Sequence, residues 1–160
     1  MAGGTPGGVT GDALPSVAAL LRRPTMKVRH ELLRGLRAAG YHDILPAHLG
    51  VFQYPGPDGQ RPGVLAARTH ASKQAMNHLL HQLETAGYLV REAHQADRRI
   101  RVVRLTERGR AASEEMARIV ARLETVWCAE LGAEHYRQMQ RALLRLGDLL
   151  DRADGVHAVS

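Results

Sequence analysis

Between residues 62 and 105 the hydrophobic pattern changes from a helical period to a strand-like one, and this order restricts the fold. A short helix is predicted from Pro62 to the turn Thr69-His70-Ala71, because proline fits the first turn of a helix. A second helix is predicted between Ser72, a good N-terminal cap, and Gly87, which ends it. The residues expected to face inward are Val64, Leu65 and Ala66 in the first helix and Met76, Leu79, Leu80 and Leu83 in the second.

Two segments that follow, residues 88–93 and 100–105, are rich in β-branched side chains and partly alternate between apolar and polar positions. The polar stretch over residues 94–99 joins them, so we predict a β-hairpin with a basic tip. Two short helices separated by a tight turn and followed by a two-stranded ribbon form a winged helix-turn-helix. The predicted fold class is therefore mainly α with a small β-hairpin wing.

Helical patterns flank this motif. On its N-terminal side we predict helices over residues 14–22, 24–39 and 46–53, with an interruption at Arg23-Pro24. On its C-terminal side Thr106 is expected to cap a helix that runs to about Trp127, and a last helix follows over 134–153. Apolar stripes on these two helices favour a dimerisation domain, with burial inside one chain as the alternative. The stripe residues are Met116, Ile119, Val120, Leu123, Val126 and Trp127, and then Met139, Leu143, Leu146 and Leu150.

The length of 160 residues suits a single domain. Residues 1–11 are glycine-rich and predicted to be a flexible tail. The further segments expected are N-terminal helices for dimerisation and support (12–54), the winged helix-turn-helix (55–105), C-terminal dimerisation helices (106–153) and a second tail (154–160).

The net charge of +6 favours a polyanionic partner, since arginine and lysine displace counterions from phosphates. The composition has another explanation, because arginine, alanine and glycine are also abundant in proteins from GC-rich genomes. The arrangement of the charges must therefore decide between the two.

The exposed side of the second helix favours DNA as that partner. Its outward residues include no acid before Glu84, whereas an ordinary solvated helix face mixes both signs. Asn and Gln can pair with adenine through two hydrogen bonds, and Lys can reach guanine or a phosphate. The predicted DNA contacts on this acid-free face are Ser72, Lys73, Gln74, Asn77, His78 and His81, and Gln82 is expected to lie on the same face.

The tip of the predicted hairpin carries Arg98, Arg99 and Arg101 beside one acid, Asp97. Arginines on a thin ribbon suit a narrow and strongly negative minor groove, and a solvated polar turn is the alternative. We expect Arg99 to pair with Asp97, and Arg98 to enter the groove. Residues 61–105 would then form a DNA-reading head.

The chain resembles the MarR family of transcriptional regulators in three stretches taken together, Leu83-Glu84-Thr85-Ala86-Gly87-Tyr88-Leu89-Val90-Arg91, Asp97-Arg98-Arg99 and Leu105-Thr106-Glu107-Arg108-Gly109. The resemblance implies a bacterial homodimer whose N-terminal helix and last two helices form the interface, and which binds a pseudo-palindromic operator, most often as a repressor. It also implies release by a small aromatic or phenolic effector in a cleft between the reading head and the dimer domain. The residues expected to line that cleft are His30, Arg34, Tyr41, His48, Phe52 and Trp127.

No cofactor, metal site or catalytic activity is expected. The sequence lacks a Gly-x-x-x-x-Gly-Lys phosphate loop, a His-Glu-x-x-His motif, a Gly-x-Ser-x-Gly motif and a dinucleotide-binding motif. Neither a signal peptide nor a long apolar run is evident, which predicts a soluble cytoplasmic protein. The competing hypothesis is a winged-helix module that binds DNA without reading its sequence, or that binds another protein. Gln74 and Asn77 argue against it, since both can read bases.

Overall fold

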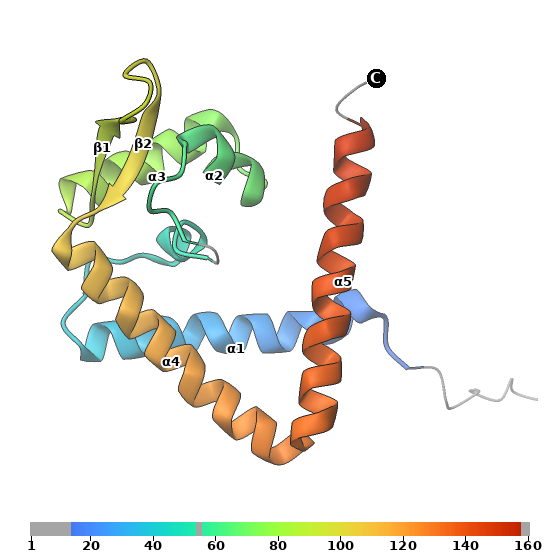
Figure 1. Ribbon diagram of the computed structural model, residues 1–160. Coiled ribbons are helices and arrows are strands. Elements are labelled where there is room, and N and C mark those ends of the chain that lie inside the picture. Colours follow the sequence, from blue (N-terminus) through green and yellow to red (C-terminus); the bar gives the residue numbers. More distant parts are fainter. Residues whose placement is uncertain (1–13, 54–55, 158–160) are drawn as a thin grey trace, which may run out of the picture.

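The computed structural model describes residues 14–53 and 56–157, so the tail predicted over residues 1–11 lies outside the described residues. In Figure 1 the sheet, α2 and α3 form one lobe, α4 runs away from this lobe across α1, and α5 stands apart beyond the far end of α4. This arrangement confirms the predicted fold class, mainly α with a hairpin wing. The elements are α1 (Val17–Ala38), the 3-10 helix η1 (Pro46–Gly50), α2 (Pro62–Arg68), α3 (Lys73–Thr85), β1 (Leu89–Ala93), β2 (Arg101–Leu105), α4 (Glu107–Leu131) and α5 (Ala133–His157).

Helix α1 is continuous, so the interruption predicted at Arg23-Pro24 is wrong. Ser16 caps the helix, because its Oγ accepts a hydrogen bond from the backbone N–H of Ala19 (3.3 Å). Pro24 has no N–H to donate to the carbonyl of Leu20. Both residues are exposed, so water can satisfy that carbonyl and the helix continues past the proline.

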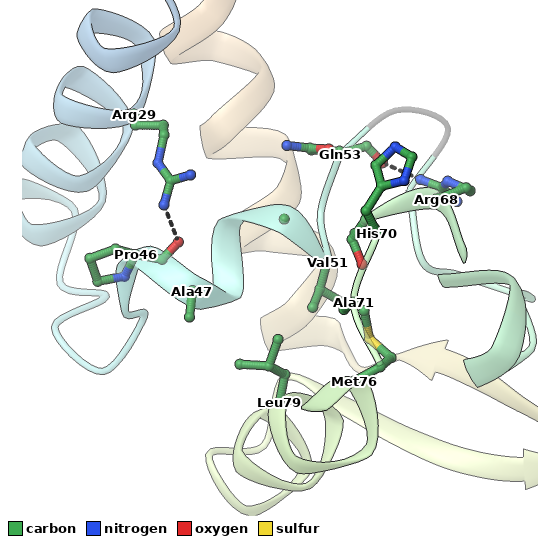
Figure 2. A pocket seen from close by; sticks show the side chains of 12 residues that line it. Arg29, Pro46, Ala47, Val51, Gln53, Arg68, His70, Ala71, Met76 and Leu79 are labelled. Carbon is green, nitrogen blue, oxygen red and sulfur yellow. Dashed lines mark hydrogen bonds between the residues drawn. The ribbon is translucent and has the colours of Figure 1, made fainter. Parts of the chain in front are cut away.

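The 3-10 helix η1 is shorter than the helix predicted over residues 46–53. It lies between α1 and the reading head. On one side Arg29 of α1 donates a hydrogen bond to the carbonyl of Pro46 (3.2 Å; Figure 2). On the other side His48 is hydrogen-bonded to Gln82 of α3 (3.0 Å). Through these contacts η1 connects the two parts of the molecule.

The helix-turn-helix follows the predicted boundaries. Helix α2 begins at Pro62, and Ser72 caps α3 by accepting a hydrogen bond at Oγ from the N–H of Ala75 (3.1 Å). His70 in the turn between them has a φ of 51°, a left-handed conformation that is uncommon outside glycine. Leu65 and Ala66 are buried as predicted, but Val64 is 42% exposed, so its predicted inward position is wrong. Successive helical residues are rotated by about 100°, so Val64 lies about 200° from Ala66 and cannot share its inner face.

The wing is an antiparallel hairpin in which Leu89 lies opposite Leu105 and Ala93 lies opposite Arg101. The free edge of β2 is extended by the chain just before α2. There the N–H of Gly59 donates to the carbonyl of Val103 (2.7 Å), and the N–H of Val103 donates to that of Gln60 (2.8 Å). This short third segment fixes the base of the wing against the helix-turn-helix.

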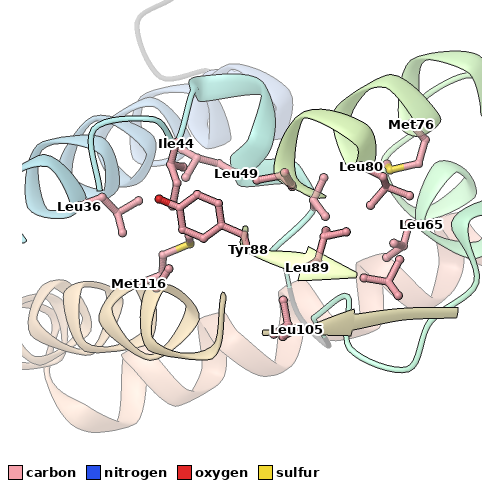
Figure 3. Close-up of a cluster of buried hydrophobic side chains, with 14 of the residues drawn as sticks. Leu36, Ile44, Leu49, Leu65, Met76, Leu80, Tyr88, Leu89, Leu105 and Met116 are labelled. Atoms are coloured by element: carbon pink, nitrogen blue, oxygen red, sulfur yellow. The ribbon is translucent and has the colours of Figure 1, made fainter. Parts of the chain in front are cut away.

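A single hydrophobic core joins the helices to the reading head (Figure 3). Tyr88 lies at the centre of this core, and its ring is fully buried. It is surrounded by Leu36 of α1, by Ile44 from the segment after α1, and by Met116 of α4. Leu80 and Leu83 of α3 are also fully buried, which confirms the predicted inner face of that helix. The position of α3 is therefore set by the same core that holds α1 and α4.

Helices α4 and α5 cover only part of their own apolar surface. Thr106 caps α4 as predicted, with Oγ accepting from the N–H of Gly109 (3.0 Å), and Gly132 (φ 80°) turns the chain into α5. Both helices exceed their predicted ends at Trp127 and Ala153. The stripe residues Met116 and Ile119 are buried, but Val126, Met139, Leu143 and Leu150 are exposed. No helix in the described part of the chain is long and apolar enough to span a membrane.

Candidate nucleic-acid interface

The outer face of α3 presents the predicted side chains to solvent. Ser72, Lys73, Gln74, Asn77, His78 and His81 are all exposed, whereas Met76, Leu80 and Leu83 fix the opposite face in the core. Because the Ser72 Oγ caps α3 as an acceptor, its hydroxyl proton stays free to donate. The N-terminal end of α3 thus carries a partial positive charge, a lysine and several groups that can bind DNA bases or phosphates.

The first acid of α3, Glu84, is neutralised within the reading head. It receives two hydrogen bonds from the guanidinium of Arg91 in β1 (3.1 and 2.8 Å) and a third from the backbone N–H of the same residue (3.2 Å). This ion pair holds the start of the wing against the end of α3. It also keeps the carboxylate from repelling phosphates.

Gln82 does not belong to the exposed face, so its predicted position is wrong. Its Oε1 accepts a hydrogen bond from Nε2 of His48, whose Nδ1 in turn accepts from the N–H of Leu45 (3.2 Å). His48 is buried, and both of its ring nitrogens are occupied by these bonds. The pair holds the C-terminal half of α3 against η1, so the side-chain oxygen of Gln82 is engaged inside the protein.

The wing tip is shaped by Asp97, although not through the guanidinium of Arg99 as predicted. Its carboxylate accepts a hydrogen bond from the backbone N–H of Arg99 (2.9 Å), and its carbonyl accepts one from the N–H of Ile100 (3.0 Å). Within the described residues, no carboxylate lies within salt-bridge distance of Arg98, Arg99 or Arg101, and all three are exposed. The tip therefore offers three free guanidinium groups on a narrow hairpin.

Comparison with known proteins supports this description of the reading head. A sequence model of the MarR family matches residues 42–100. The HTH-type transcriptional repressor Rv2887 of Mycobacterium tuberculosis is 37% identical over 92 residues, which are 55% of this chain and 66% of that protein. The crystal structure of Rv2887 with p-aminosalicylic acid has 27% identity and a TM-score of 0.59, and the match covers 83% of this chain and 99% of that one.

The chain belongs to the MarR family. Two further crystal structures share the fold at 21% identity. One is MarR itself, with a TM-score of 0.71 over 90% of this chain and 97% of that one. The other is the transcriptional repressor CouR bound to a 23-mer DNA duplex, with a TM-score of 0.62 over 82% and 92% of the two chains.

This MarR-family chain has a cavity of about 320 Å³ where α1, η1 and the helix-turn-helix meet. Its apolar wall includes Val51 together with Met76 and Leu79 from the underside of α3 (Figure 2). Its polar groups include the guanidinium groups of Arg29 and Arg68, and Arg68 also donates to the carbonyls of Gln53 (2.9 Å) and Gly56 (3.2 Å). Two cations above an apolar wall suit a small molecule with an acid group and an aromatic ring.

The six residues predicted to bind an effector do not line this cavity. His30 and Arg34 are exposed on α1, and Tyr41 and Phe52 pack against the core. Trp127 is half-buried on α4, and His48 borders a second cavity beside His81 and Asp43. Sequence reasoning missed Arg29 and Arg68, because their approach to one cavity depends on how η1 and α2 pack. In the described residues no three His, Cys, Asp or Glu side chains are grouped to bind a metal ion.

Proposed function

We propose that this chain is a sequence-specific DNA-binding regulator that represses transcription from a pseudo-palindromic operator as a homodimer. The observation that carries the proposal is the acid-free face of α3 beside three arginines of the wing tip that pair with no carboxylate in the described part of the chain. Repression is supported by the relatives, since the curated proteins matched are transcriptional repressors. We also propose that the chain binds DNA and does not catalyse a reaction. Because the proposed partner is genomic DNA, we place its action in the cytoplasm.

The geometry supports a division of labour between helix and wing. Lys73, Gln74, Asn77 and His78 lie on the first two turns of α3, the part of a recognition helix that enters the major groove. Arg98 and Arg101 lie on the wing, where they would enter or flank the adjacent minor groove. Two heads related by a twofold axis would bind half-sites about one helical turn apart.

Removing one wing arginine tests the proposed minor-groove contact. Arg98→Ala is expected to weaken DNA binding by about tenfold at low salt, to a similar extent on every sequence, because it removes a charge that contacts no base edge. The slope of log affinity against log salt should become shallower by about 1. Fluorescence-anisotropy titrations at several salt concentrations measure both quantities.

Two variants serve as controls for this experiment. Arg118→Ala removes the same charge from the exposed side of α4, far from the reading head along the chain, and should leave the affinity unchanged. Asn77→Ala should instead lower the affinity for the preferred sequence more than that for others. An Arg98→Ala variant that binds like the wild type would contradict the role given to the wing.

The exposed apolar surface supports a homodimer. Leu143 and Leu150 of α5 are 40% and 58% exposed, and Leu20 at the N-terminal end of α1 is 51% exposed. Large exposed apolar surfaces usually mark an interface, and α5 packs in the chain mainly against α4. A second copy of the chain is the partner that a palindromic operator requires, since its symmetry mirrors that of the protein.

A small aromatic acid is the proposed effector, bound in the cavity lined by Arg29 and Arg68. The relative Rv2887 has been crystallised with p-aminosalicylic acid and with salicylic acid. An occupant of the cavity would touch Met76 and Leu79 on the inner face of α3, and could thereby displace the face that contacts DNA. This contact gives an effector a direct route to the recognition helix.

The effector proposal predicts that p-aminosalicylate raises the melting temperature of the protein and releases bound DNA. Arg29→Met should weaken p-aminosalicylate binding by about tenfold, since it removes a charged hydrogen-bond donor. Arg34→Met, on the same helix but outside the cavity, is the matched control. If only the Arg34 variant lost affinity, the effector would occupy the cleft predicted from the sequence instead.

A further inference from the structure

Three side chains from separate parts of the chain meet where the reading head joins α1 and α4. Asp43 follows α1, Tyr88 precedes β1, and Arg108 lies in the first turn of α4. The hydroxyl of Tyr88 donates a hydrogen bond to the carboxylate of Asp43. Arg108 donates to both oxygens of that carboxylate (3.1 and 2.8 Å) and to the Tyr88 hydroxyl (3.0 Å). These contacts form the Asp43–Tyr88–Arg108 cluster.

The cluster combines a rigid centre with directional bonds. The ring of Tyr88 is buried in the core, and the guanidinium of Arg108 lies over it, 4.5 Å from the ring centre. This position allows a cation–π contact in addition to the hydrogen bonds. The carboxylate of Asp43 is thus held by two donors, the buried Tyr88 and the half-exposed Arg108 that lies over its ring.

Charge states at neutral pH favour the complete network. Burial acts to raise the pKa of Asp43, but the hydrogen bond from Tyr88, a backbone hydrogen bond and the positive charge of Arg108 together outweigh it, so this pKa lies below its ordinary value. Burial and then the hydrogen bond to Asp43 raise the pKa of Tyr88. Asp43 is therefore ionised and Tyr88 keeps its proton, as the observed bonds require.

The neighbouring backbone bonds join only two of the three parts. The Thr106 hydroxyl donates to the carbonyl of Gly87 (2.6 Å), and the N–H of Thr106 donates to that of Tyr88 (3.1 Å), which holds α4 to the wing. Asp43 adds the segment after α1. The cluster thus adds a polar contact that joins the segment after α1, the start of the wing and α4 at one point, beside the link through η1.

We propose that the Asp43–Tyr88–Arg108 cluster fixes the angle of the reading head and so determines which half-site spacing the dimer accepts. The inference rests on the proposed function, because it needs two heads on one operator. Each added base pair moves a half-site by about 3.4 Å and rotates it by roughly 35° around the duplex. A head held at one angle by a rigid joint can reach only one such position without strain.

Operators with half-sites moved apart or together by one base pair test the proposal, using the site that the wild type selects from random duplexes. We expect the wild type to prefer one spacing strongly. Tyr88→Phe and Arg108→Gln should reduce that preference at least about threefold while binding to a single half-site stays unchanged, because each removes hydrogen bonds of the joint but no DNA contact. Tyr41→Phe is the matched control, since its ring packs 6.2 Å from that of Tyr88 and its hydroxyl makes no hydrogen bond within the described residues.

The possible results separate the two proposals. If the wild type discriminates between sequences but both variants keep its spacing preference, the role of the cluster is overturned and the proposed function stands. If the wild type shows no preference for any sequence, both are overturned. Arg108 is half-exposed, so its variant decides the question even if Tyr88→Phe fails to fold.

Discussion

Replacing Gly109 by alanine is expected to lower the free energy of unfolding by about 3 kcal/mol and the melting temperature by roughly 10 °C. A Cβ at this position would lie 1.9 Å from the carbonyl oxygen of Tyr88 and 3.1 Å from Cδ2 of Leu105. The obstacle is backbone, which a rotamer change cannot relieve. Thr106 holds the same carbonyl through its N–H (3.1 Å), so the backbone at Tyr88 cannot move away without breaking that bond.

Gly63→Ala is the matched control for this prediction. A Cβ on Gly63 meets nothing within 4 Å, and alanine is favoured over glycine in a helix by up to about 1 kcal/mol. Thermal unfolding followed by circular dichroism should therefore show a slightly raised melting temperature for Gly63→Ala and a large loss for Gly109→Ala. Similar melting temperatures for Gly109→Ala and the wild type would show that α4 does not meet the wing as described.

Introducing charges into the apolar stripe of α5 (the seam) is expected to abolish the proposed dimer and to weaken operator binding by a hundredfold or more. The seam consists of Met139, Leu143, Leu146 and Leu150. Leu143→Asp combined with Leu150→Asp would place carboxylates where the partner copy covers leucines, and a buried unpaired charge costs several kcal/mol. Losing the second head removes the gain from bivalent binding, about 10²–10⁴ in affinity. Sedimentation velocity gives the mass, and titration of the full operator gives the affinity.

A change on a different face of the same helix controls for the added charge. Gln138→Glu introduces an acid at an exposed position outside the seam and should leave the dimer intact. Binding of the Leu143 and Leu150 double variant to a single half-site should match that of the wild type, because the reading head is untouched. A double variant that remains dimeric would exclude the seam as the interface.

The elements of the reading head could be predicted from the sequence because local chemistry determines them. Ser72 and Thr106 both cap helices as expected, since a side-chain oxygen satisfies backbone donors within three residues of it. The inner face of α3 follows from the spacing of its leucines. The hairpin follows from β-branched residues on either side of a polar turn.

The incorrect predictions arose where a contact is distant along the chain or where solvent replaces one. Pro24 does not end α1, because Leu20 and Pro24 are both exposed and water can satisfy the carbonyl that is left without a donor. Gln82 leaves the acid-free face because its side-chain oxygen accepts a hydrogen bond from Nε2 of His48, which lies 34 positions away in the sequence. The Asp43–Tyr88–Arg108 cluster spans 65 positions, and no periodicity in the sequence indicates it.

The contacts of Asp97 illustrate a finer limit. The sequence places it beside three arginines, so a side-chain ion pair was the natural expectation. In the structure Asp97 accepts instead from the backbone N–H of Arg99, a local bond that acidic residues commonly make in turns. The guanidinium groups are left free, which strengthens the basis for a DNA contact by the wing.

The central claim, that the exposed face of α3 reads DNA sequence, is tested most directly by one ratio of dissociation constants. A duplex selected from random sequences and a scrambled duplex of equal length and composition are titrated at the same salt concentration. Specific recognition predicts that the selected duplex binds about 10³-fold more tightly or better, with a pseudo-palindromic sequence. A ratio near one would contradict it and would favour a winged-helix module that binds DNA without reading its sequence.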